Sequence, residues 1–154
     1  MRFLAVLLFF LLVLSGCDDS RIFEGNKDFA KRAWAMNDTV AFEFKVEDPS
    51  ASYNVLCNVR NTLDYPYSRI FVNYTLEDST HRVLTTKLIS DYLFDVKTGE
   101  PKGNSGLGDI YDHRISVETR TLPTGKYFVK LQQYMRTDTL QGILAAGVRV
   151  EKGR

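Results

Sequence analysis

Cys17 is the residue whose neighbours predict a definite chemical reaction. It follows Leu14-Ser15-Gly16, and small residues before a cysteine are the pattern at which a bacterial export signal is cut and the new N-terminal thiol is acylated. Upstream, Arg2 supplies one positive charge before the apolar run 3–14, which is too short to span a bilayer as a permanent helix. We therefore predict a lipoprotein signal peptide over residues 1–16 and membrane anchorage through lipidated Cys17, because several acyl chains bind a bilayer stably.

Cys57 is the only other cysteine, so acylation of Cys17 leaves the exported domain without an intrachain disulfide. It lies on the same side of an alternating segment as Tyr53, Val55 and Val59. This parity predicts a small, buried core residue. The alternative is a catalytic or partner-linking thiol.

The glycine-rich stretch 97–109 invites comparison with a phosphate-binding loop, because glycine lets backbone amides approach an anion. Such a loop needs Gly-Lys-Ser/Thr opening a helix, whereas a predicted strand follows here. We interpret the stretch as a long exposed connection that offers a contact surface.

Residues suited to metal binding or catalysis form no recognisable set. His81 and His113 have no ligand-spaced companion, which argues against zinc, and no Gly-x-Ser-x-Gly elbow occurs. Four aspartates near the glycine-rich stretch offer oxygen ligands for calcium, but their spacing fits no EF-hand, and solvated turn residues are the alternative: Asp91, Asp95, Asp109 and Asp112. We predict no catalytic residues, no cofactor and no metal site.

Three aromatic residues are the candidate contacts for a partner. Tyr65 and Tyr67 flank a proline, and together with Trp34 they can stack on sugar rings or dock a protein if they are exposed. The alternative for the tyrosine pair is that it braces the edge of the core.

The elements that must position these residues are strands. Val40, Phe42, Phe44 and Val46 alternate with small or charged residues, and comparable segments recur between turn signals such as 122–125. The predicted strands cover 40–46, 53–60, 70–76, 82–89, 92–95, 110–119, 127–134 and 143–151, while 139–146 also fits a helical turn. Many short strands without a sustained helical period predict an all-β fold, a single antiparallel β-sandwich of Ig-like or jelly-roll-like type.

Length and composition agree with one domain. Removal of 16 residues from 154 leaves 138, enough for a real core, and 44% of all residues are hydrophobic. The charges nearly cancel to +1, which argues against nucleic-acid binding. We predict a lipidated tether and strap over 17–38, followed by the β-sandwich domain over 39–154.

Several stretches together resemble the gliding motility lipoprotein GldH family of Bacteroidetes. They span nearly the whole mature chain in the expected order: Phe23-Glu24, Tyr53-Asn54, Val59-Arg60-Asn61, Tyr65-Pro66-Tyr67, Gly106-Leu107-Gly108-Asp109, Gly125-Lys126-Tyr127 and the ending Gly147-Val148-Arg149-Val150-Glu151-Lys152.

The resemblance implies an envelope protein that supports gliding motility, or the type IX secretion machinery allied with it, through contacts with proteins of that machinery. It implies no catalytic residues. Asp18-Asp19, directly after the lipid cysteine, resembles a surface-export signal of Bacteroidetes lipoproteins, whereas aspartate next to the cysteine resembles an inner-membrane retention signal in enterobacteria. We expect the outer membrane, with the periplasmic and the surface orientation both open. The alternative function is a surface glycan-binding module that uses Trp34, Tyr65 or Tyr67.

Overall fold

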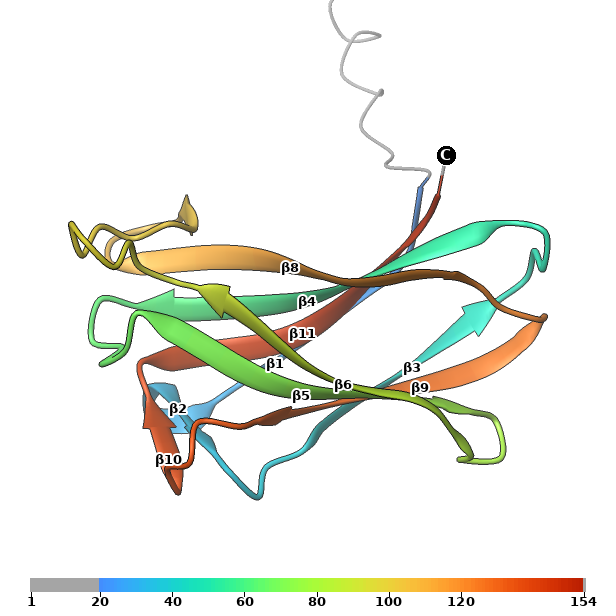
Figure 1. Ribbon diagram of the computed structural model, residues 1–154, viewed down its shortest axis with the longest axis horizontal. Coiled ribbons are helices and arrows are strands. Elements are labelled where there is room, and N and C mark those ends of the chain that lie inside the picture. Colours follow the sequence, from blue (N-terminus) through green and yellow to red (C-terminus); the bar gives the residue numbers. More distant parts are fainter. Residues whose placement is uncertain (1–19, 154) are drawn as a thin grey trace, which may run out of the picture.

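The computed structural model describes residues 20–153, and eleven strands account for most of them (Figure 1). The predicted signal peptide and Cys17 lie outside the described residues. The strands are β1 (Arg21–Asp28), β2 (Ala33–Ala35), β3 (Val40–Val46), β4 (Ser52–Thr62), β5 (Arg69–Asp78), β6 (Val83–Tyr92), β7 (Asn104–Ser105), β8 (Ile110–Thr121), β9 (Gly125–Gln133), β10 (Thr139–Gln141) and β11 (Ile143–Lys152), with one 3₁₀ turn at Ala30–Arg32.

Two antiparallel sheets face each other across the core, which confirms the predicted sandwich. One sheet has the order β1-β11-β4-β8-β7 and the other has the order β3-β9-β5-β6, while β2 and β10 form a small ribbon. Within residues 20–153 there is no helix long and apolar enough to cross a membrane.

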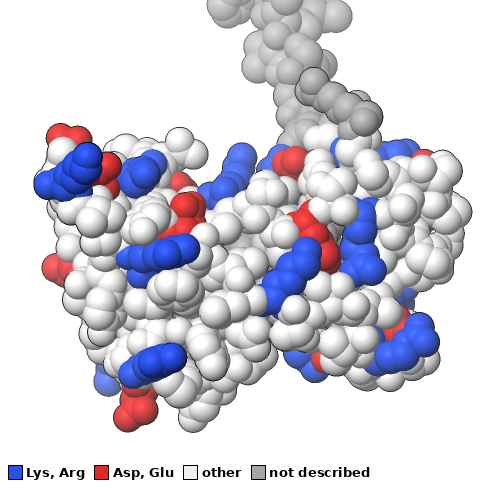
Figure 2. Space-filling view, in the orientation of Figure 1, with Lys and Arg blue, Asp and Glu red and all other residues white. Residues whose placement is uncertain are grey.

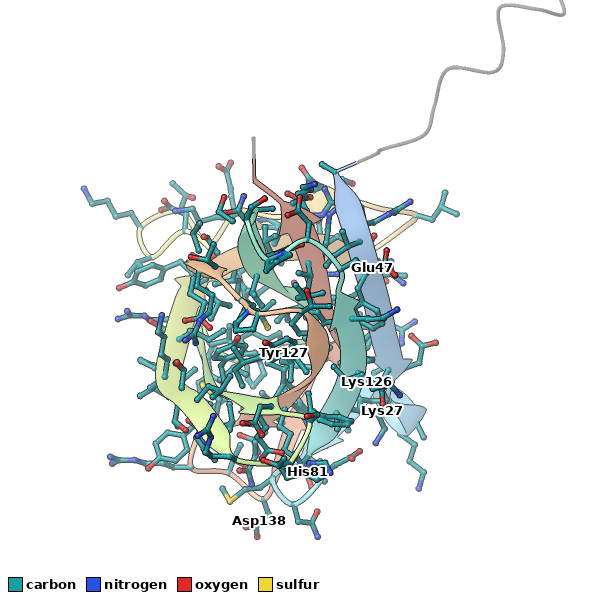
Figure 3. The ribbon with its side chains drawn as sticks, turned by 90° about the vertical axis from the view of Figure 1, so that its right-hand side faces the viewer. Lys27, Glu47, His81, Lys126, Tyr127 and Asp138 are labelled. Carbon is teal, nitrogen blue, oxygen red and sulfur yellow. The ribbon has the colours of Figure 1, made fainter. Side chains whose placement is uncertain are left out.

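The core is filled by alternate residues of both sheets, as the period-two pattern requires. Cys57 is fully buried on the inner face of β4, so its prediction as a core residue is confirmed. From the four-stranded sheet, Tyr127 stacks on Phe44 with ring centroids 5.6 Å apart. Figure 3 shows side chains, Tyr127 among them, filling the space between the two layers.

β1 lies in the stretch for which the sequence predicted a tether and strap. It pairs along β11 from Arg21↔Glu151 to Asp28↔Ala145 and forms the edge of the five-stranded sheet. A Cβ on Gly25 would lie 2.9 Å from the rings of Phe23 and Phe42, so glycine occupies this inward position because the two rings fill the space. The sandwich therefore begins well before residue 39.

The β2–β10 ribbon resolves the segment that fitted either a strand or a helical turn. Leu140 pairs with Trp34, and Gly142 then connects β10 to β11 with a positive φ of 77°. A Cβ on Gly142 would lie 2.4 Å from the backbone nitrogen of Tyr65. Residues 139–146 are thus extended, with a glycine where the chain passes close to the β4–β5 connection.

The two ends of the sandwich differ. At one, which we call the terminal end, β1 begins beside the end of β11 and the start of β4 (Figure 1), and Lys152 N donates to Ser20 O at 2.6 Å. At the other, the loop end, lie the connections 63–68 and 93–109 and the segment 134–138. Loops at the loop end are therefore separated from residue 20 by the length of the strands.

Candidate functional site

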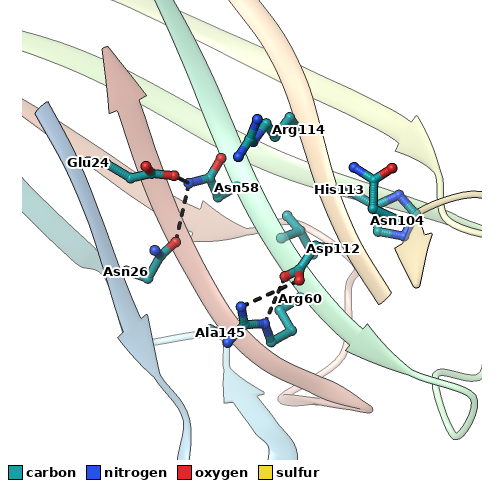
Figure 4. Close-up of a pocket in the computed structure, with 10 residues that line it drawn as sticks. Glu24, Asn26, Asn58, Arg60, Asn104, Asp112, His113, Arg114 and Ala145 are labelled. Carbon is teal, nitrogen blue, oxygen red and sulfur yellow. Dashed lines mark hydrogen bonds and ion pairs between the residues drawn. The ribbon is translucent and has the colours of Figure 1, made fainter. Parts of the chain in front are cut away.

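A polar hollow of about 240 Å³ lies on the outer face of the five-stranded sheet (Figure 4). It forms because outward-facing residues of β1, β4, β7 and β8 are polar, while Ala145 of β11, the strand between β1 and β4, has only a small side chain. The lining residues are Glu24, Asn26, Asn58, Val59, Arg60, Asn104, Asp112, His113, Arg114 and Ala145.

Asn58 is the hub of the hydrogen bonds in the hollow. Its Nδ2 donates to Glu24 Oε1 at 3.1 Å and to Asn26 Oδ1 at 3.3 Å, which links β4 to β1 across β11. Its Oδ1 is buried and accepts no hydrogen bond from any described residue. A buried acceptor without a partner is costly, so this oxygen is available to a donor group of a bound molecule.

Both carboxylates of the hollow are matched by guanidinium groups. Glu24 accepts hydrogen bonds from Arg21 at 2.8 Å and Arg149 at 3.0 Å, and Arg60 donates to Asp112 at 2.7 Å. Burial opposes ionisation of Glu24, but the hydrogen bonds from Arg21, Asn58 and Arg149 outweigh it and lower its pKa. The hydrogen bond to Asp112 raises the pKa of Arg60.

These contacts suit the hollow to binding polar groups. Its lining contains no serine, threonine, cysteine or tyrosine that could act as a nucleophile. Burial lowers the pKa of His113, which keeps the imidazole neutral near pH 7. Arg114 and Asn104 are exposed and make no side-chain hydrogen bond or ion pair within residues 20–153, so their donors can reach a bound molecule.

The aromatic residues singled out from the sequence do not line this hollow. Trp34 is fully buried, stacks on Phe29 at 5.1 Å and donates its indole N–H to Asp38 O at 2.8 Å. Tyr65 is buried too, stacks on Phe94 and donates its hydroxyl to Arg69 O at 3.0 Å. Burial removes both rings as stacking platforms, and Tyr65 instead braces the core edge.

Tyr67 is 44% exposed and meets Tyr65 edge-on, with centroids 5.8 Å apart. Of the three predicted contact residues, it is the one whose ring reaches solvent, and its contact role stays a prediction. The lipidation of Cys17 also stays a prediction, because that residue lies outside the described residues.

The four aspartates weighed as possible calcium ligands are held by other partners or lie apart within the described residues. Asp109 pairs with Arg32, Asp112 pairs with Arg60, and Asp95 accepts hydrogen bonds from the backbone N–H groups of residues 97 and 98. Within the described part of the chain, no group of three or more His, Cys, Asp or Glu residues is placed to hold a metal ion. The interpretation as turn and surface residues therefore fits the structure better.

The sequence did not predict the hollow, although it places polar residues at alternate positions of two strands that line it. Asn54, Asn58 and Arg60 occupy the outward positions of β4, and Asp112 and Arg114 those of β8. Their parity marks them as solvent-facing, but only the pairing of β4 with β8 and β11 makes them neighbours.

Comparison with known proteins decides the family. The family described as GldH lipoprotein matches residues 21–150, which is nearly all of the sandwich. The chain belongs to this family. It is 27% identical to the gliding motility lipoprotein GldH of Flavobacterium johnsoniae, covering 96% of this chain and 94% of the relative. It is 28% identical to the GldH homolog of Christiangramia forsetii, covering 96% and 93%.

Solved structures show weaker likeness to this GldH-family chain. A viral VP2 subviral particle of infectious bursal disease virus gives a TM-score of 0.37 at 10% identity, and dimeric latent PorU from Porphyromonas gingivalis gives 0.35 at 9%. Each match covers 86% of this chain but only 30% and 13% of the solved chain. Likeness at this level carries no functional argument.

Proposed function

We propose that this chain is an envelope-anchored, non-enzymatic lipoprotein that supports gliding motility, and the associated type IX secretion apparatus, through contacts with other proteins. The family match over residues 21–150 carries the proposal, since both relatives are named gliding motility lipoproteins. A polar hollow without a nucleophile fits a role in binding. Lipid on Cys17 fixes the domain at a membrane, and we assign it to the outer membrane.

The start of β1 limits the distance between domain and lipid. Arg21 is four residues beyond Cys17, and an extended chain spans at most about 3.5 Å per residue, so this connection reaches about 14 Å at most. The terminal end of the sandwich is therefore held close to the bilayer. Anchorage confines the domain to the envelope and raises its effective concentration near partners, so modest contacts suffice.

Deletion of the gene tests the role directly. The mutant is expected to lose colony spreading and to release less secreted protein into the medium, and the full chain supplied in trans is expected to restore both. Cys17→Ser is expected to fail to restore them. Cys57→Ala is the matched cysteine control and is expected to restore them, because Cys57 is a buried core residue. A deletion mutant that matches its parent in both assays contradicts the proposed role.

Two of the three rings that the glycan-binding alternative needs, those of Trp34 and Tyr65, are buried. Tyr67 alone leaves one stacking surface, and the aromatic residues do not line the polar hollow. Protein contacts are therefore the better-supported mode of action.

A further inference from the structure

Exposed apolar side chains gather toward the loop end of the sandwich. Leu88, Tyr92 and Tyr134 are among the large apolar residues that remain exposed, and they lie near one another on the outer face of the four-stranded sheet. Figure 2 shows that the left of the molecule, the loop end, is largely uncharged, with separate basic and acidic side chains standing on it. A grouped apolar surface of this kind marks a contact site more often than scattered residues do.

We call Phe71, Leu88, Tyr92, Tyr134 and Met135 the β5–β6 patch. Four of them, with Arg136, surround a hollow of about 310 Å³. The segment carrying Tyr134 and Met135 is fixed to β5, because Tyr134 N donates to Phe71 O at 2.9 Å and Phe71 N donates to Met135 Sδ at 3.2 Å. The patch is therefore built on a strand and held in place before any partner binds.

Cations surround the β5–β6 patch. The guanidinium of Arg69 lies 4.8 Å from the ring centre of Phe71 and 5.0 Å from that of Tyr92, and Lys102 Nζ lies 5.9 Å from the latter. Arg69 donates to Ser90 Oγ at 2.7 Å, while its Nε is buried without a partner. Within residues 20–153, neither Arg69 nor Arg136 forms an ion pair, so the positive charge of these two guanidinium groups is not neutralised by a neighbouring carboxylate. Lys102 forms no ion pair either, but its charge is close enough to Asp95 to help lower the pKa of that carboxyl.

The edge of the sheet adds a place for an extended chain. β6 is the last strand of the four-stranded sheet, and its residues Leu88 and Tyr92 alternate onto the outer face beside Phe71. A strand laid along such an edge gains backbone hydrogen bonds and presents alternate side chains to the patch. Carboxylates on that strand would meet guanidinium groups that form no ion pair within residues 20–153, and hydrogen bonds between guanidinium and carboxylate are stronger than those between neutral groups.

We propose that the β5–β6 patch docks an extended segment of another envelope protein, one that carries acidic residues next to apolar ones. The inference deepens the proposed function and rests on it. A second copy of this chain fits poorly, because a two-fold contact centred on the patch would bring Arg69, Lys102 and Arg136 of both copies into one interface. The bilayer that holds Cys17 is adjacent to the terminal end, so its lipid headgroups are far from the patch.

Photocrosslinking in cells that carry the full chain tests the docking. A photoreactive phenylalanine analogue, p-benzoylphenylalanine, replaces Leu88, and the matched control replaces Val83 on the same strand, since the two residues are 55% and 54% exposed. We expect one discrete protein adduct from position 88, at least about tenfold stronger than from position 83, and mapped by mass spectrometry to a segment with net negative charge. The proposal is overturned by an adduct to a second copy, to lipid or lipopolysaccharide, or to a segment without acidic residues. Equal yields at both positions overturn it as well.

Charge variants separate this proposal from the proposed function. In the chain that carries the photoreactive analogue at position 88, Arg69→Glu combined with Arg136→Glu is expected to lower the adduct yield by about tenfold or more. The reason is that opposite charges across the interface become like charges. Arg69→Lys keeps the charge and is expected to retain most of the yield. A melting temperature within a few degrees of the parent shows that each variant is folded. If gene deletion abolishes spreading while the double reversal leaves both spreading and adduct unchanged, the docking proposal fails and the proposed function stands.

Discussion

The thiol of Cys57 allows a quantitative test of the core. Burial raises its pKa to about 12 from a usual value of 9.0. At pH 8 the thiolate fraction is then about a thousandfold smaller than in an unfolded chain, and the thiolate is the reacting form. Because Cys57 is also inaccessible, alkylation must wait for the sandwich to open. We expect the folded chain to react with iodoacetamide at least about a thousandfold more slowly than the chain in denaturant.

The assay uses the Cys17→Ser variant, in which Cys57 is the only thiol. Mass spectrometry follows the adduct over time at pH 8, with and without denaturant, and the same variant with Cys57→Ala gives the background. Labelling of the folded chain within about tenfold of the denatured rate would refute the burial argument. It would also revive the alternative that Cys57 links to a partner.

Three further predictions concern stability. Trp34→Ala is expected to lower the free energy of unfolding, measured in denaturant, by about 3–5 kcal/mol, because the ring is fully buried. Tyr67→Ala is expected to lower it by less than about 1 kcal/mol, because that ring is partly exposed. Gly142→Ala is expected to lower the melting temperature, because its positive φ and the nearby backbone of Tyr65 leave no room for a Cβ; an unchanged melting temperature contradicts this. Burial lowers the pKa of His113 below its usual 6.5, so the unfolded chain takes up a proton more readily and the free energy of unfolding falls as the pH drops below about 6.5. Denaturant titrations between pH 7.5 and 5 are expected to show a shallower fall in that free energy for His113→Gln than for the parent. Equal pH dependence in the two chains would contradict this.

The regular strands could be predicted from the sequence because burial on one face leaves a period of two. The segment 40–46 matches β3 at both ends, and the predicted strands 53–60 and 110–119 lie within β4 and β8. β1 escaped prediction because it is an edge strand. Gly25 packs against the rings of Phe23 and Phe42, while Lys27 is exposed and pairs with Asp38, so no run of alternating hydrophobic residues marks the strand.

Burial of single aromatic rings was harder to predict than strands. Cys57 lies in a long alternating segment, so parity alone assigns it to the core. Trp34 lies in a three-residue strand beside charged residues, and its burial depends on Phe29 and on the pairing of Leu140 more than a hundred positions later. The polar hollow has the same origin, because its residues come from strands whose adjacency the sequence does not reveal.

The fold and the proposed anchor together limit where a partner can be. β4 has 11 residues, and a rise of about 3.3 Å per residue gives a strand of about 36 Å. With a connection of about 14 Å at most between Cys17 and Arg21, the end of β4 at the loop end lies no more than about 50 Å from the lipid. Two stacked sheets do not stretch, so a partner of the β5–β6 patch must present its acidic segment within that height. A flexible insertion after Cys17 would relax this limit, but it would also lower the effective concentration of the patch near its partner. The contact would then weaken although every contacting residue is unchanged.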